Sequence, residues 1–241
     1  MPGSPTRSSA DAFLWWRSLL FALALIAAGV VLPIFVAAFL LVGHAMTKSD
    51  LTSPATALGL QFVSYAFVLV VCLAYLPRLA RSSLADLGLR LPNAAEVGWG
   101  LAGAVAMLVA VDLVGSLEER LFHTKITETA IDLLKATRGT LLTTLFVTFA
   151  CVIAPFFEEL QFRGFLYNAL RRYLPTAWAA ILSGLVFGAA HFSALAIVPL
   201  ACGGVVLALV YERTRSLAAT TIAHGLFNAA GVTALLVFHQ A

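Results

Sequence analysis

Residues 19–43 of the chain read LLFALALIAAGVVLPIFVAAFLLVG, a run that contains no charged residue. The hydrocarbon core of a bilayer is about 30 Å thick, and a helix needs about 20 apolar residues to cross it. The run is longer than the roughly 7–15 apolar residues of a cleavable signal peptide. We therefore interpret it as an uncleaved first membrane span.

The composition of the whole chain agrees with this interpretation. Hydrophobic residues make up 61% of the 241 residues and charged residues only 11%, and the mean hydropathy is +0.95. A soluble domain has about 25% charged residues. We predict an all-α fold, a polytopic transmembrane helical bundle, because a helix satisfies its own backbone hydrogen bonds in lipid. The net charge of +3 is small and its bases are dispersed, so we expect no nucleic-acid partner.

Six further apolar stretches follow the first, which gives seven predicted spans. Eight spans are the alternative, because the first stretch can bend at Pro33 and the sixth contains Pro199. The six further stretches are 55–76, 97–117, 141–173, 177–191, 194–211 and 217–238.

The distribution of basic residues predicts the orientation. Cytoplasmic loops are enriched in Lys and Arg. With the N-terminus inside, the inner side carries ten of the 15 basic residues. We predict a multi-pass protein of the cell membrane, with residues 1–18 as a cytoplasmic N-terminal tail. Segment 118–139 mixes acidic and basic residues with apolar ones at helical spacing, and we expect a helix lying along the membrane surface there.

Polar side chains interrupt three of these apolar stretches. Charged and ionisable groups at membrane depth are costly to bury, so each is a candidate for function. Counting about 1.5 Å of rise per residue from the span ends places them at similar depths in the bilayer. They are Glu158, Glu159 and Arg163 in the fourth span, His191 in the fifth, and His224 with Asn228 in the seventh.

Helical spacing separates the two adjacent glutamates. Successive residues of a helix are rotated by about 100°, so Glu159 and Arg163 share a face and can neutralise each other. Glu158 points away from that pair and is the carboxylate left free to act as a base. The same four-residue spacing places Phe187 one turn from His191.

The three clusters resemble a known family. Glu158 to Arg163, with the sequence EELQFR, is similar to an EExxxR motif, Phe187 to His191 to an FxxxH motif, and His224 to Asn228 to an HxxxN motif. These motifs, in this order, are typical of the CAAX prenyl endopeptidase and bacteriocin-processing family of intramembrane glutamate proteases. The resemblance covers roughly residues 141–237.

The resemblance implies peptide hydrolysis by an activated water, without a covalent intermediate. In this sequence Glu158 would be the general base, and His191 would orient or polarise the water. His224 and Asn228 would donate hydrogen bonds to the developing oxyanion, a role that suits fixed donors in a water-poor site. The Glu159–Arg163 pair and Phe187 would hold the catalytic residues in position.

A metal-free reaction is the favoured interpretation. Two histidines and a glutamate form a plausible zinc set, so zinc stays the alternative. Asn is a poor zinc ligand, however, and the chain contains no HExxH pattern.

The resemblance also divides the chain and limits its partners. Residues 19–140 would form N-terminal membrane helices with a surface loop, and 141–241 the helices of the catalytic core. The substrate would be a peptide or protein met in the lipid bilayer. The family includes enzymes that trim prenylated C-terminal tails, others that act on peptide leaders, and members with unknown targets, and the sequence does not separate them. Two other hypotheses stay open: a non-proteolytic membrane scaffold or immunity protein of the same fold, and an ion-coupled transporter.

Overall fold

Helices account for all the regular structure in the part of the chain that can be described. The computed structural model describes residues 9–43, 47–51, 53–79, 85–123, 129–191 and 193–238. Its longer helices are α1 (Ser9–Val42), α3 (Pro54–Leu79), α4 (Ala94–Phe122), α9 (Thr176–Ala189), α10 (Ile197–Thr214) and α11 (Leu217–Phe238). Two short helices, α2 (Lys48–Leu51) and α5 (Thr129–Ala136), lie in the connections. The predicted all-α membrane bundle is confirmed.

One continuous helix of 32 residues, Thr140–Arg171, carries the first motif. It consists of α6 (Thr140–Thr148), the π-helical segment η1 (Phe149–Ile153), α7 (Ala154–Glu159), a second π-helical segment η2 (Leu160–Tyr167) and α8 (Asn168–Arg171). Pro155 is the second residue after η1, and it has no N–H to continue the α-helical ladder. Wide turns of this kind occur often at functional sites.

Six of the described helices are long and apolar enough to cross a membrane, whereas seven or eight spans were predicted. The predicted fifth span, 177–191, is instead the 14-residue helix α9, whose length of about 21 Å falls short of the bilayer core. The alternative of eight spans is not confirmed either, because α1 continues as one helix through Pro33 and α10 contains Pro199 within one helix. Likewise, α4 extends to Phe122, so the predicted surface helix is reduced to α5, and residues 124–128 lie outside the described chain.

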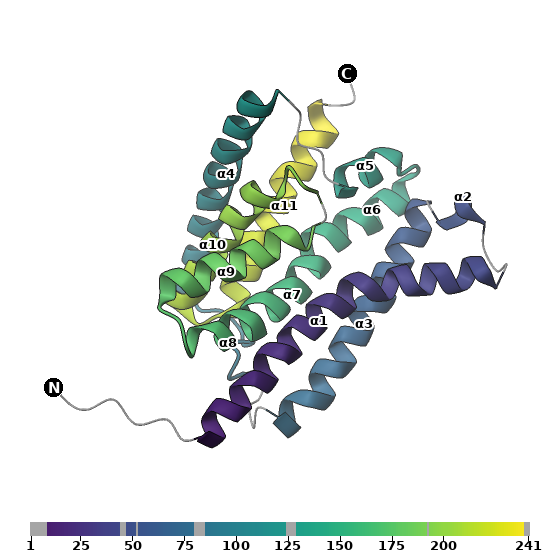
Figure 1. The fold of residues 1–241 in the computed structure, drawn as a ribbon. Coiled ribbons are helices and arrows are strands. Elements are labelled where there is room, and N and C mark those ends of the chain that lie inside the picture. The colour runs from purple at the N-terminus through teal and green to yellow at the C-terminus, as the bar shows by residue number, and fades with distance from the viewer. Residues whose placement is uncertain are drawn as a thin grey trace.

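Two groups of helices make up the bundle (Figure 1). Helices α4, α9, α10 and α11 pack together in one group, and α1 runs beside α3 in the other. The helix Thr140–Arg171 joins them, because η2 packs against α1 while η1 and α7 pack against α11. The first motif is therefore held between the two groups.

Glycines allow α9 and α10 to pack with their backbones in contact. A Cβ atom at Gly184 would lie 2.6 Å from the carbonyl oxygen of Ala201, and one at Gly188 would overlap the carbonyl oxygen of Ile197. Gly204 on α10 in turn contacts the backbone of Gly184. This close packing fixes the end of α9, where the second motif lies.

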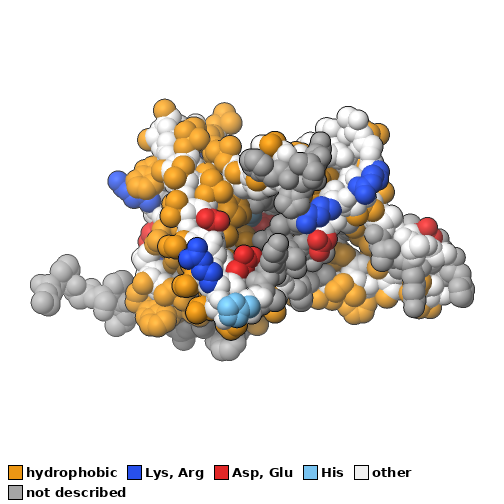
Figure 2. All heavy atoms as spheres, turned by 90° about the horizontal axis from the view of Figure 1, so that it is seen from above, with side chains coloured by type: hydrophobic (Ala, Val, Ile, Leu, Met, Phe, Trp, Pro, Cys, Tyr) orange, Lys and Arg blue, Asp and Glu red, His pale blue; other side chains and the backbone are white. Residues whose placement is uncertain are grey.

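The outer surface is apolar, as a bilayer requires. Viewed from above, hydrophobic side chains cover the sides of this face and the charged ones lie mainly across its middle (Figure 2). Phe39, Val42 and Val105 are 77%, 79% and 61% exposed. Large apolar side chains at this exposure suit contact with lipid tails rather than with water.

Candidate active site

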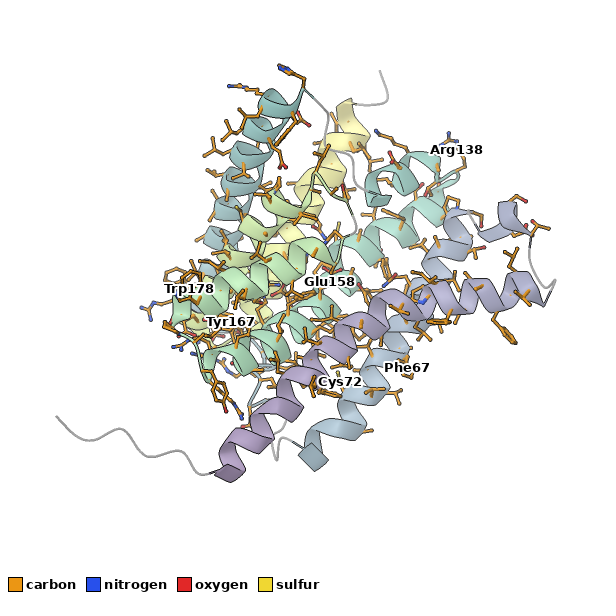
Figure 3. The ribbon with its side chains drawn as sticks, in the orientation of Figure 1. Phe67, Cys72, Arg138, Glu158, Tyr167 and Trp178 are labelled. Atoms are coloured by element: carbon orange, nitrogen blue, oxygen red, sulfur yellow. The ribbon has the colours of Figure 1, made fainter. Side chains whose placement is uncertain are left out.

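Glu158 lies near the middle of the bundle, on α7 (Figure 3). Its side chain is 20% exposed, so it is shielded from solvent but still open to a small molecule. One carboxylate oxygen, Oε1, accepts a hydrogen bond of 3.0 Å from the hydroxyl of Tyr65 on α3. The other oxygen, Oε2, lies 3.8 Å from Nε2 of His224. Each oxygen of this carboxylate therefore has a different neighbour.

Glu159 and Arg163 form the expected pair. Arg163 donates to Oε1 of Glu159 at 2.8 Å, and neither side chain has any exposed surface. A second guanidinium N–H donates to the carbonyl oxygen of Gly204 on α10 at 2.8 Å. The guanidinium also lies 4.9 Å from the ring centre of Phe187. The prediction that these residues share a face and neutralise each other is confirmed.

His224 connects the two glutamates. Its Nδ1 lies 3.0 Å from Oε1 of Glu159, while its Nε2 faces Oε2 of Glu158 at 3.8 Å. Because the carboxylate beside Arg163 can only accept, Nδ1 is the protonated nitrogen of this contact. The 3.8 Å gap on the other side is longer than a direct hydrogen bond, and a water or a substrate oxygen can contact both groups there.

His191 reaches this group through Phe187. Its ring follows the end of α9, and Nδ1 lies 2.9 Å from the carbonyl oxygen of Phe187. The carbonyl accepts only, so Nδ1 donates and Nε2 of the neutral ring keeps its lone pair. The ring of Phe187 contacts the imidazoles of both His191 and His224, with centroid distances of 4.8 Å and 5.5 Å. The second and third motifs thus meet at one buried aromatic ring.

Asn228 is one turn from His224 on α11 and donates to the carbonyl oxygen of Ala150 at 2.8 Å. In the π register of η1 the donor to this carbonyl would be residue 155, which is a proline. The Asn228 amide thus supplies the donor that the main chain lacks. The prediction for Asn228 invoked only an oxyanion, and it missed this backbone contact.

Tyr65 is the site residue that the sequence did not reveal. It lies 93 positions before Glu158, on a helix outside the three motifs. A tyrosine in an apolar span is ordinary, since its ring suits the bilayer and its hydroxyl needs only one partner. The single signal in the sequence was a phenol at the middle of a span instead of at its ends.

The described residues include no group of three or more His, Cys, Asp or Glu side chains arranged to hold a metal ion. His224 uses Nδ1 on Glu159, which leaves one nitrogen of this imidazole toward Glu158. The arrangement pairs carboxylates with nitrogen donors. It can activate and hold a water through hydrogen bonds alone.

The fold and this cluster define a polytopic helical membrane protein with a buried carboxylate and imidazole centre. Residues 139–230 match the family model described as type II CAAX prenyl endopeptidase Rce1-like. This match confirms the resemblance drawn from the three motifs, over the segment that contains them.

A relative in Bacillus subtilis (strain 168), named "Putative membrane peptidase YdiL", supports the same class. It is 24% identical over 170 residues, which cover 69% of this chain and 67% of that protein. No solved structure matches the chain. The class is therefore a multi-pass membrane protease, a hydrolase.

Proposed function

We propose that this protein is an intramembrane endopeptidase in which Glu158 activates the attacking water. The observation that carries the proposal is the unequal environment of the two adjacent glutamates. Glu159 is neutralised by Arg163 and has no exposed surface. Glu158 directs Oε2 toward His224 across a gap of 3.8 Å and is the more open of the two. A carboxylate with one open oxygen in a dry pocket is suited to remove a proton from water.

His191 supports the water in this mechanism. Its Nδ1 is held by the carbonyl of Phe187, so Nε2 presents a lone pair. That lone pair accepts a hydrogen bond from the water and helps to aim its oxygen at the scissile carbonyl. Glu158 then takes a proton and delivers it to the leaving amine, as a general base and acid. Neither step needs a covalent bond to the protein.

His224 stabilises the oxyanion when it carries both protons. Nδ1–H is directed to Glu159, and Nε2–H of the imidazolium faces the gap beside Glu158. With this protonation the two glutamates are balanced by His224 and Arg163, so the buried group has no net charge. Donors fixed in advance in a water-poor site stabilise a developing negative charge strongly.

Asn228 contributes a second donor. Its amide has two N–H groups, of which one is committed to Ala150. That contact fixes the plane of the amide, and the remaining N–H is available to the oxyanion.

The substrate is a peptide bond presented at membrane depth. Lipidated C-terminal tails and leader peptides both meet this requirement, and we place the protein in the cell membrane with its N-terminus in the cytoplasm, in agreement with the charge bias of its loops. The chemistry proposed here uses hydrogen-bonded side chains and needs no bound zinc.

The test compares membranes from cells that express the native protein, Glu158→Gln or Asp112→Asn. Asp112 is a second carboxylate within a span, exposed on α4 and remote in sequence from the three motifs. Quantitative proteomics of peptide termini should show at least one precursor that accumulates with Glu158→Gln and is processed with Asp112→Asn. Normal processing by Glu158→Gln, at native protein levels, would show that Glu158 is not the base.

A further inference from the structure

Tyr65 connects the helical group of α1 and α3 to the proposed base. It lies on α3, outside the segment 139–230 that matches the peptidase family. Its hydroxyl donates to Oε1 of Glu158 at 3.0 Å, and the residue is only 6% exposed. A hydroxyl buried at this depth needs a partner, and here the partner is the carboxylate itself.

Aromatic rings hold the phenol of Tyr65 in place. The ring stacks on Phe157, at a centroid distance of 4.9 Å and an angle of 25°. It also stacks on Phe149 at 5.6 Å and 10°, and Phe62 meets the ring of Phe149 edge-on at 4.8 Å. Stacked contacts on two neighbours restrict rotation of the ring. The hydroxyl position is therefore fixed relative to the helix that carries Glu158.

The hydrogen bond has two consequences for Glu158. It engages Oε1, so the carboxylate can rotate little and Oε2 stays directed toward His224. It is also a bond from a neutral donor to an ionised acceptor, which is about twice as strong as a bond between neutral groups. Both effects restrain the carboxylate so that Oε2 stays aimed at the gap.

We propose that Tyr65 is a positioning residue for the peptidase reaction, which holds the Glu158 carboxylate aimed at the gap beside His224 through its hydroxyl. This inference rests on the proposed function. It also assigns a role in the reaction to α3, a helix that the family match does not include. Tyr65 acts through Glu158 and does not itself contact the peptide.

The chain contains a matched control. Tyr167 is fully buried and its hydroxyl donates to Oε2 of Glu212 at 2.9 Å, also from one helix to another. Glu212 in addition pairs with Arg171 at 2.9 Å, so this contact belongs to an ion-pair network outside the three motifs. Tyr65→Phe and Tyr167→Phe each remove one hydroxyl from a glutamate. Only the first should change catalysis.

The experiment measures kcat and KM of the detergent-purified full chain on a peptide that spans the cleavage site of the precursor accumulating with Glu158→Gln. For Tyr65→Phe we expect kcat to fall roughly tenfold or more, the size expected for one lost hydrogen bond to a charged group, with KM unchanged. For Tyr167→Phe kcat should stay within about twofold of the native value, as expected of a contact outside the site.

Two further readouts separate positioning from folding. The infrared band of the Glu158 carboxylate, assigned by its loss in Glu158→Gln, should shift in Tyr65→Phe and stay in place in Tyr167→Phe. In the Glu158→Gln background Tyr65→Phe should cause no further loss of the residual rate, because both changes act on one group. The infrared band reports on folded protein even if activity is weak.

The outcomes distinguish the two proposals. Native kcat in Tyr65→Phe, together with an inactive Glu158→Gln, overturns the role of Tyr65 and leaves the proposed function in place. Native activity in Glu158→Gln overturns the assignment of Glu158 as the base, on which the role of Tyr65 rests. An unshifted carboxylate band in Tyr65→Phe also overturns the role of Tyr65, because the hydrogen bond would then be absent from the protein.

Discussion

Replacing Arg163 with Met removes the cation from a pair that has no exposed atom. Arg163 donates to Glu159 and to the carbonyl oxygen of Gly204, both at 2.8 Å. After the substitution Glu159 remains in the bundle with His224 as its hydrogen-bond partner. Breaking a buried ion pair in this way costs about 3–5 kcal/mol of unfolding free energy. We expect Arg163→Met to lose an amount in this range.

The double variant Glu159→Gln with Arg163→Met tests the origin of that loss. It removes both charges, so the defect that remains is mainly the Gly204 carbonyl without its donor, at about 1–3 kcal/mol. We therefore expect the double variant to be about 2 kcal/mol more stable than Arg163→Met alone. The measurement is reversible unfolding in mixed micelles, followed by helical circular dichroism.

Arg90→Met is the control for an ion pair whose cation is exposed. Arg90 pairs with Glu96 at the start of α4, and its side chain is 46% exposed. Glu96 is only 8% exposed but keeps the backbone N–H of Asn93 as a donor, so the loss of the exposed Arg90 cation should cost about 1 kcal/mol. If Arg163→Met also lost less than about 1 kcal/mol, Arg163 would behave as an exposed residue. The charge cluster on which the proposed mechanism depends would then not be buried in the protein.

Three further predictions follow from contacts around the site. Asn228→Ala should reduce the unfolding free energy by about 1–3 kcal/mol in the same assay, because the Ala150 carbonyl loses its donor; an unchanged value would show that η1 satisfies this carbonyl in another way. Gly225→Ala should lower the yield of folded protein, since a Cβ would overlap the carbonyl oxygen of Cys151. Gly231→Ala has open space on the same helix and should be neutral, so equal yields would refute the close contact. Incubation with EDTA should leave the rate of precursor cleavage unchanged, and a loss restored by zinc would favour the metal alternative.

The sequence predicted the membrane bundle and the local pairs because both depend on short-range periodicity. Glu159 with Arg163 and Phe187 with His191 are four residues apart, so one helical turn determines each contact. The predicted number of spans was wrong at α9. The sequence is apolar over 177–191, but the helix ends at Ala189. Hydropathy measures how apolar a segment is, and the point where a helix stops depends on its packing against α10.

Contacts between distant segments could not be predicted in the same way. The wide turn of η1 depends on Pro155 together with Asn228, a donor from α11 that a local reading of the Pro155 region does not reveal. Tyr65 shows the same limit, since nothing within α3 indicates that its hydroxyl meets Glu158. Depth estimates can bring residues to one height in the bilayer. They do not say which faces of the helices turn toward each other.

His224 couples the two adjacent glutamates. Helical rotation alone places Glu158 and Glu159 on different faces and predicts separate roles for them. In the folded chain one imidazole lies 3.0 Å from Glu159 and 3.8 Å from Glu158. The charge on Glu159 therefore sets whether Nδ1 of His224 holds a proton, and this determines what Nε2 presents to the gap. In the proposed mechanism a substitution at Glu159 should thus impair catalysis through His224 even where the bundle stays folded, which gives the EExxxR pair a role in the proposed chemistry as well as in stability.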